Sequence, residues 1–186
     1  DHLLLEIYKK QGDSEKLTEL LYQKFRFHHS TDTLQALLEV IGHDKRDEVI
    51  ADEVALILEG SSLRELDADF LIAIGKLDEA EKYLLQRANQ FDGNHYGSLL
   101  SLAEAMESEN RHLVASLIYR SLLISILKRG HTKAYPHGVR YLKKLDKLAA
   151  AIPDWKEFDH HEAFKSRMYQ DHGRKHSLWS KYGLRK

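Results

Sequence analysis

The sequence predicts an all-α fold, and more specifically a tetratricopeptide-like, right-handed helical-repeat solenoid of about ten helices. Residues that favour helices dominate the 186-residue chain, which contains 2 prolines and no alternating runs rich in valine. Apolar residues recur at helical spacing in segments that end at glycines, as helix C-termini commonly do. The repeated segments start 30, 33 and 35 residues apart, at Gly12, Gly42, Gly75 and Asn110. A period near 34 residues is typical of tetratricopeptide repeats.

Residues 112–128 are predicted to form the central helix of the domain. The segment is apolar on nearly all sides, and a helix with that composition is usually buried. Arg120 interrupts the apolar run, which therefore falls short of the ~18–20 residues that a membrane span needs. We expect Leu117, Leu123 and Ile126 to lie in the core of a protein that does not enter the membrane.

Seven further helices are expected before the central one. They cover about residues 2–11, 15–25, 31–41, 44–59, 63–74, 76–91 and 95–107. Candidate N-caps are Ser14, then Ser30 or Thr31, and Ser62, because short hydroxyl side chains accept hydrogen bonds from free backbone N–H groups. The sequence Asp92-Gly93-Asn94 predicts a turn.

Two helices and a tail are expected after Gly130. The first covers about residues 135–152, with Pro136 in its first turn, where a missing N–H group costs little. Asp159 and Glu162 resemble a capping box for the second, which ends at Gly173. Trp179 is the expected anchor of the tail.

Each repeat is expected to place small or apolar residues on one face of its second helix. The residues five, nine and thirteen positions after each start are Leu17, Leu21 and Phe25; Asp47, Ala51 and Ala55; Ala80, Leu84 and Ala88; and Ala115, Tyr119 and Leu123. Asp47 breaks the pattern, and a compact irregular bundle is the competing interpretation. A solenoid would offer a concave surface that binds partners.

Several short stretches resemble an uncharacterised bacterial helical family. They are residues 90–96, residues 132–137 with Tyr141-Leu142, Asp154-Trp155 with Phe158, and His172-Gly173-Arg174-Lys175 with Trp179. The resemblance covers residues 87–179 well and residues 1–86 only in general pattern. Related helical regions occur beside SWIM zinc fingers, whose Cys ligands are absent here. The resemblance implies a tetratricopeptide-like domain of unknown function, without a catalytic residue.

Charge is distributed unevenly along the chain. Residues 1–127 carry 13 Lys+Arg and 23 Asp+Glu, a net charge of −10, whereas residues 128–186 carry 15 and 6, a net charge of +9. The length suits a single domain over residues 1–186. The chain starts at Asp1 without a methionine and has no cysteine. We therefore expect the C-terminal part of a longer, cytoplasmic polypeptide.

The basic C-terminal end, residues 128–186, contains the candidate partner-binding residues. They are Arg140, Lys143, Lys144 and Lys147 on one helix face, and His172, Arg174, Lys175 and Trp179 in the tail. The favoured interpretation is a scaffold that binds a protein, a peptide or a neighbouring domain. The alternative is a nucleic-acid-associated domain, since Tyr135, Tyr141, Trp155, Trp179 and Tyr182 could stack on bases. The basic end could also contact the acidic part of its own chain.

No pattern predicts an enzyme, a cofactor or a metal centre. Motifs for phosphate loops, nucleophile elbows and zinc proteases are absent from the sequence. The adjacent pairs His28-His29 and His160-His161 do not converge on one metal, because neighbours on a helix point about 100° apart. These histidines are expected to be solvated or to cap helices. Asp67 and Asp69 are expected to lie on a solvated face.

Overall fold

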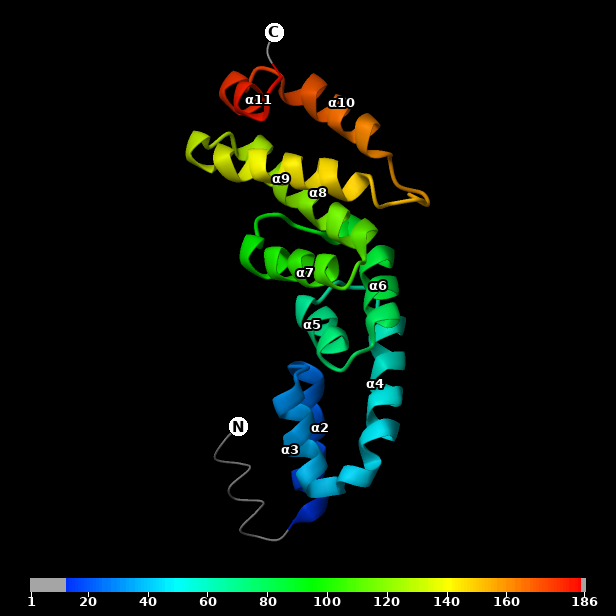
Figure 1. Cartoon of the computed structure of the whole chain (residues 1–186). Helices are drawn as coiled ribbons and strands as arrows, with labels where there is room; N and C mark the ends of the chain where they lie inside the picture. The colour runs from blue at the N-terminus through cyan, green and yellow to red at the C-terminus, as the bar shows by residue number, and fades with distance from the viewer. Residues whose placement is uncertain (1–12, 185–186) are drawn as a thin grey trace. The chain divides into compact units, whose positions relative to one another are not determined.

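The computed structural model describes residues 13–184, and every regular element in that range is a helix (Figure 1). The range contains ten α helices and three short 3-10 helices, with no strand among the described residues. This confirms the all-α prediction. The helix expected at about residues 2–11 lies outside the described residues. None of the described helices is both long and apolar enough to cross a bilayer.

Two compact units make up the chain, residues 1–83 and residues 84–186. The boundary falls within helix α6 (Leu77–Gln86). The chain, whose length suits a single domain, thus forms two compact units. They are called unit 1 and unit 2 below.

The described part of unit 1 begins with a pair of packed helices, α2 (Ser14–Phe27) and α3 (Thr31–Ile41). Helix α2 buries Leu17, Leu21 and Phe25 at the predicted spacing. Its N-cap is Asp13, whose carboxylate accepts a hydrogen bond from the Lys16 backbone, so the prediction of Ser14 as the cap is wrong by one residue. Aspartate is an equally good cap, and it stands one position earlier.

Helix α3 has the cap and the terminator that its sequence predicts. The Ser30 hydroxyl accepts a hydrogen bond from the Thr33 backbone at 3.1 Å, and the Thr33 hydroxyl accepts one from the Ser30 backbone. Gly42 ends the helix with a φ of 106°, a left-handed conformation that disfavours other residues.

The rest of unit 1 consists of η1 (His43–Lys45), α4 (Arg46–Glu59), α5 (Glu65–Ala73) and the start of α6. Ser62 does not cap α5, whose N-cap is Arg64 without a side-chain hydrogen bond. Instead, the Ser62 carbonyl accepts a hydrogen bond from the Tyr83 hydroxyl at 3.2 Å. Tyr83 on α6 thereby holds the α4–α5 connection in place.

Unit 2 is built around the central helix α8 (His112–Arg129), which packs against α7 (Tyr96–Ser108) and α9 (Tyr135–Ala149) (Figure 1). The remaining elements are η2 (Ala88–Gln90), η3 (Thr132–Ala134), α10 (His161–His172) and α11 (His176–Tyr182). Thirteen residues of α8 are buried, including Leu117, Leu123 and Ile126, which confirms the central-helix prediction. Gly130 ends α8 in a left-handed conformation.

The predicted repeat face is present in some helices and missing in one. The residue triads in α2 and α8 are buried, as are Ala80 and Leu84 in α6. In α4, however, Asp47, Ala51 and Ala55 are all exposed. That helix buries Val49, Ile50, Glu53, Val54 and Ile57 instead. The face of α4 thus follows its larger apolar side chains, which remove more surface from water than alanine does.

The start of α10 differs from the predicted capping box. Its N-cap is His160, without a side-chain hydrogen bond. The Asp159 carboxylate pairs with Arg167, and the Glu162 carboxylate pairs with Lys165 at 2.9 Å. Long cationic side chains within reach therefore bind both carboxylates in place of the backbone N–H groups.

Candidate binding site on unit 2

The four predicted cations of α9 do not share one environment. Arg140, Lys143 and Lys147 are exposed, whereas Lys144 is half-buried. The Lys144 ammonium lies 2.9 Å from the Glu107 carboxylate of α7. One of the predicted cations thus contacts the acidic part of the chain, and three face solvent.

The predicted tail residues are mostly used within the fold. Trp179 is 2% exposed, and its indole N–H donates to the His172 carbonyl at 2.9 Å, which confirms Trp179 as the anchor of the tail. Burial, and then the charge of Lys175, lower the pKa of His172. The Lys175 ammonium lies 3.1 Å from the position that a Cβ on Gly130 would take, beside the C-terminus of α8. Cations are favourable at that end of a helix. Arg174 is exposed.

The aromatic side chains of the basic end do not form an exposed stacking surface. Tyr135, Tyr141, Trp155 and Trp179 are all buried, at 5% exposure or less. Tyr182 is half-buried, and its hydroxyl donates to the Asp146 carboxylate at 2.6 Å. Four of these rings pack in the core, and Tyr182 is bound through its hydroxyl group.

A groove of about 300 Å3 opens between α7, α8 and the start of α9, and we call it the α7–α9 groove. Its lining consists of Gly93, Tyr96, Leu100, Leu122, Ile126, Arg129, Ala134, His137, Arg140 and Tyr141. Leu122 and Ile126 form a buried apolar floor, and Tyr96 is 64% exposed. Of the predicted site residues, the structure brings Arg140 alone into this groove.

The guanidiniums of Arg129 and Arg140 line the groove together with the His137 imidazole, and no carboxylate does. Arg140 donates from Nη2 to Nδ1 of His137 at 3.0 Å, and its guanidinium lies 5.8 Å from the centre of the Tyr141 ring. Arg129 makes a long hydrogen bond of 3.5 Å from Nε to the Ser125 carbonyl. Among the described residues, neither guanidinium has a carboxylate partner. The groove is therefore electropositive and suits an anionic group.

A tight turn builds one wall of the groove. A Cβ on Gly93 would lie 2.4 Å from the Ser121 carbonyl oxygen and 2.7 Å from Cβ of Ser125, so only glycine lets the turn lie on α8. The Ser125 hydroxyl donates to the Asn94 side-chain oxygen at 3.2 Å, which holds the turn there. His95, the N-cap of α7, comes next, and Tyr96 is the first residue of that helix.

The lining of the groove includes residues from two of the stretches that carry the family resemblance, residues 90–96 and residues 132–137. Tyr96, Arg129 and His137 are not among the site residues that the sequence predicts. Their charge and aromatic character are visible in the sequence, but they belong to three different segments. The resemblance was the one sequence signal that pointed to two of them.

A second polar cluster joins α9, α10 and α11. The Asp146 carboxylate accepts hydrogen bonds from His161 at 2.7 Å, Lys165 at 3.3 Å and Tyr182 at 2.6 Å. Burial alone would raise the pKa of Asp146, but these hydrogen bonds lower it.

Asp146, His161 and Glu162 have the donor atoms of a metal site, with one ligand atom from each within 4.8 Å of the others. The Lys165 ammonium already lies between the two carboxylates, 3.3 Å from Asp146 and 2.9 Å from Glu162. Nδ1 of His161 is buried without a hydrogen-bond partner, whereas metal-bound histidines usually donate through their second nitrogen. The arrangement therefore fits a structural cluster of ion pairs better than a metal centre.

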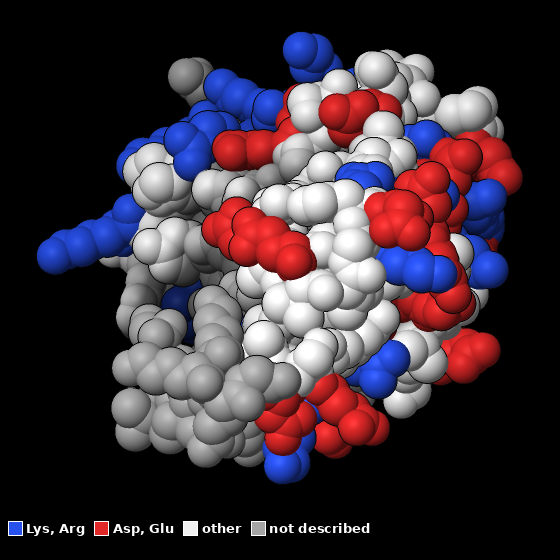
Figure 2. Space-filling model, turned by 90° about the horizontal axis from the view of Figure 1, so that it is seen from below, with Lys and Arg blue, Asp and Glu red and all other residues white. Residues whose placement is uncertain are grey.

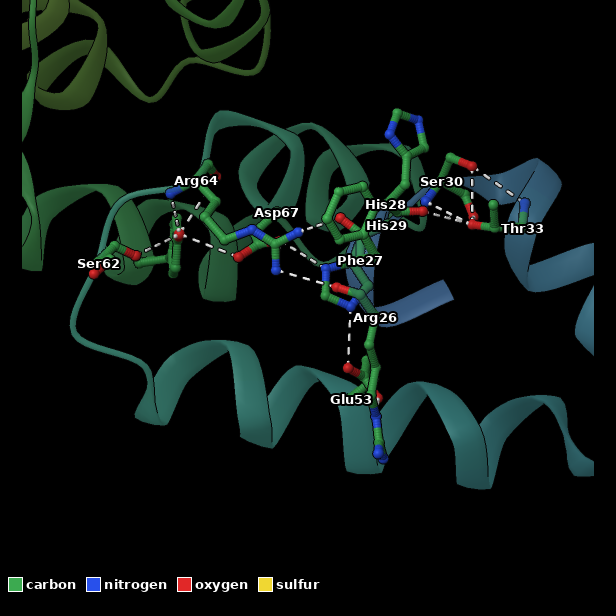
Figure 3. A network of polar contacts seen from close by, with 11 residues as sticks. Arg26, Phe27, His28, His29, Ser30, Thr33, Glu53, Ser62, Arg64 and Asp67 are labelled. Atoms are coloured by element: carbon green, nitrogen blue, oxygen red, sulfur yellow. Dashed lines mark hydrogen bonds and ion pairs between the residues drawn. The ribbon is translucent and has the colours of Figure 1, made fainter. Parts of the chain in front are cut away.

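Unit 1 contains a buried histidine between two carboxylates (Figure 3). Nδ1 of His29 lies 2.6 Å from Asp67, and Nε2 lies 3.0 Å from Glu53. The expectation that His29 and Asp67 are solvated is wrong, since they and Glu53 are each 3–4% exposed. Burial alone would lower the pKa of His29, but the hydrogen bonds to the two carboxylates raise it, which favours the cationic imidazole with both ring nitrogens donating. Neither nitrogen is then free to act as a general base.

Arginines complete this network at both ends. Arg26 donates from Nε to Glu53 at 3.2 Å, and Nη1 of Arg64 lies 3.5 Å from the Asp67 carboxylate. Nη2 of Arg64 also donates to the Phe27 carbonyl at 2.6 Å, at the C-terminus of α2. The charges alternate along the network, which fastens α2, α4 and α5 together.

Charges of both signs are mixed on the face that Figure 2 presents. Acidic and basic side chains lie among one another there, with uncharged surface between them.

Fold and site together define an all-helical protein of two compact units, with a cationic groove in the second. The chain belongs to the family of unknown function DUF6880, whose model matches residues 1–181. The match includes residues 1–86, where the resemblance was only general. Among curated proteins and solved structures, none matches this chain.

Proposed function

We propose that this chain is a non-catalytic protein-interaction domain and that unit 2 binds an acidic segment of a partner protein at the α7–α9 groove. The observation that carries the proposal is the pair of guanidinium groups, of Arg129 and Arg140, in a groove without a carboxylate. An acidic segment would supply the missing charges. Complementary charge also accelerates association and selects among partners.

A role in binding is supported by the way the buried histidines are used. Both nitrogens of His29 contact carboxylates. Nε2 of His161 contacts Asp146, and its Nδ1 is buried, out of reach of a substrate. The chain contains no cysteine nucleophile. A general base needs a free lone pair within reach of a substrate proton. His29 offers none in this arrangement.

A protein partner is favoured over nucleic acid by the shape and lining of the groove. Its floor is aliphatic, and Tyr96 is its one exposed aromatic ring. Binding of single strands generally needs several rings on which successive bases stack. The nucleic-acid alternative for residues 128–186 is therefore kept as an outcome of the experiment.

We also propose that successive helix pairs within each unit pack as in tetratricopeptide repeats. The buried triads of α2 and α8 support it, whereas α4 departs from the pattern. Helical repeats of this kind present surfaces to partners. In a longer cytoplasmic polypeptide, such a domain would position a neighbouring module, as the resemblance to regions beside SWIM zinc fingers suggests.

The test is the binding of a fluorescent acidic peptide to the 186-residue chain, measured by anisotropy. Changing Arg129 and Arg140 to glutamate should weaken binding by about tenfold or more, which is about 1.4 kcal/mol per factor of ten. The matched control changes Lys143 and Lys147 to glutamate, which alters the charge equally outside the groove. It should have a much smaller effect.

Equal losses in both variants would assign binding to the general charge of the protein and overturn the groove as its site. Tighter binding of a single-stranded oligonucleotide than of every acidic peptide would favour the nucleic-acid alternative. Raising the salt concentration should weaken the peptide complex, because ions screen exposed charges over about 8–10 Å.

A further inference from the structure

We infer that the α7–α9 groove is a specificity pocket for one bulky apolar side chain, and that the partner segment is an acidic peptide with such a residue between its carboxylates. This inference rests on the proposed function. It adds what the groove selects, because charge alone does not distinguish one acidic segment from another.

The volume of the groove suits one large side chain. At about 300 Å3 it lies at the lower end of the range for small-molecule sites, about 300–1,000 Å3. A cavity of ~150 Å3 holds a benzene molecule. The groove is open, so part of its volume would be filled by the peptide backbone. One leucine or phenylalanine side chain would fill most of the rest.

The floor of the groove is apolar, and it is formed by a well-buried helix. Leu122 and Ile126 belong to α8, the most enclosed helix of unit 2. Leu100 of α7 and Ala134 of η3 close the groove at its sides. An apolar side chain that enters would therefore meet carbon on several sides, in a pocket that needs little rearrangement to accept it.

A ligand side chain in the groove would explain the exposed position of Tyr96. Tyr96 is a large side chain left 64% exposed at the edge of the groove, and exposed aromatic rings next to a pocket are typical of binding hot spots. A ligand side chain on the floor could be covered by the Tyr96 ring. The tyrosine would then lose water-exposed surface only in the complex.

The positions of the arginines determine the pattern of the ligand. Arg129 comes from the end of α8 and Arg140 from α9, and both line the groove that holds the apolar floor. Carboxylates that pair with these arginines would therefore stand close to the buried side chain. This favours an acidic–apolar–acidic sequence over a uniformly acidic one.

The experiment compares two short acidic peptides that differ at one position, leucine or alanine between aspartates. The unmodified 186-residue chain should bind the leucine peptide about tenfold to a hundredfold more tightly, from the apolar surface removed from water. Ala134→Trp, which fills the groove, should remove this preference and leave binding of the alanine peptide. Ala150→Trp, at an exposed position outside the groove, should retain the preference.

Tyr96→Ala provides a second test, since an exposed side chain can be removed without disturbing the core. It should reduce the preference for leucine by severalfold while the circular dichroism spectrum stays unchanged. If both peptides bind equally, and Arg129→Glu weakens both, the inference is overturned and the proposed function stands. If neither peptide binds, both are overturned.

Discussion

Replacement of His29 tests the buried network of unit 1. His29→Leu would leave Glu53 and Asp67 buried without the cation that lies between them at 3.0 and 2.6 Å. Removing one partner of a buried ion pair typically costs about 3–5 kcal/mol. The ring also packs against Phe70 and Phe25, with centroids 5.4 and 5.1 Å away, and leucine would retain part of that packing.

The same network predicts how stability depends on pH. Burial alone would lower the pKa of His29, but the hydrogen bonds to Asp67 and Glu53 outweigh it, and the pKa is raised above 6.5. The folded state therefore holds the proton more tightly than the unfolded state does. The stabilisation by His29 is fully present below about pH 6.5 and is lost as the pH rises through the raised pKa.

Glu53 sets the opposite limit. Burial on its own would raise the pKa of Glu53, but the hydrogen bonds from His29 and Arg26 lower it. Its contribution is present above about pH 4.5 and is lost as the pH falls through the lowered pKa. Unit 1 should therefore be most stable in the mildly acidic range between these limits.

Amide exchange of α4 and α5, measured at about pH 6 and about pH 8 after correction for intrinsic rates, would test this. Tryptophan fluorescence would not report on unit 1, since both tryptophans of the chain lie in unit 2. His28→Leu is the matched control, because His28 is the exposed neighbour and should change stability by less than about 0.5 kcal/mol. A cost below about 1 kcal/mol for His29→Leu, or equal costs for the two variants, would refute the reasoning.

Three further predictions concern unit 2. Gly93→Ala should cost about 1–3 kcal/mol, seen as a lower unfolding midpoint by tryptophan fluorescence, because the added methyl group overlaps α8; an unchanged midpoint would contradict this. Burial, and then Asp146, raise the pKa of Tyr182 to about 12, so Asp146→Asn should lower it in a spectroscopic titration and speed amide exchange in α11. Arg120 is buried against the Trp155 ring and donates to the Asp159 backbone carbonyl at 2.8 Å, and no carboxylate of residues 13–184 pairs with it, so Arg120→Met should change stability far less than Arg120→Ala, which would leave a cavity costing about 2–5 kcal/mol. Similar losses in urea unfolding for both Arg120 variants would show that the charge itself matters.

The helices and the core of this protein were largely predictable because the information is local. Ser30 begins α3 through its own hydroxyl group, and Gly42 ends it through its own backbone conformation. The all-round apolar character of residues 112–128 predicts burial wherever that helix packs. Trp179 could be identified as an anchor because it is the largest apolar side chain of the tail, and it is buried beside Leu178.

Caps and single charges were predicted less well, because several partners compete for each. Asp13 caps α2 in place of its neighbour, and Asp159 binds Arg167 in place of the backbone of α10. Lys144 forms an ion pair with Glu107 on α7, and the position of Lys144 in α9 does not reveal this partner. Small differences in distance decide such contacts, and sequence spacing does not contain those distances.

By itself, the sequence determined that the chain is helical, which helix is central and which end is basic. Only the tertiary structure decided what those charges and rings do. His29 meets Asp67 across 38 residues and Glu53 across 24, and burial then makes a charged network from side chains expected in solvent. The α7–α9 groove likewise joins Tyr96, Arg129 and Arg140 from three helices. The physical reason is that secondary structure depends on neighbours in sequence, whereas a pocket or buried ion pair depends on the packing of distant segments.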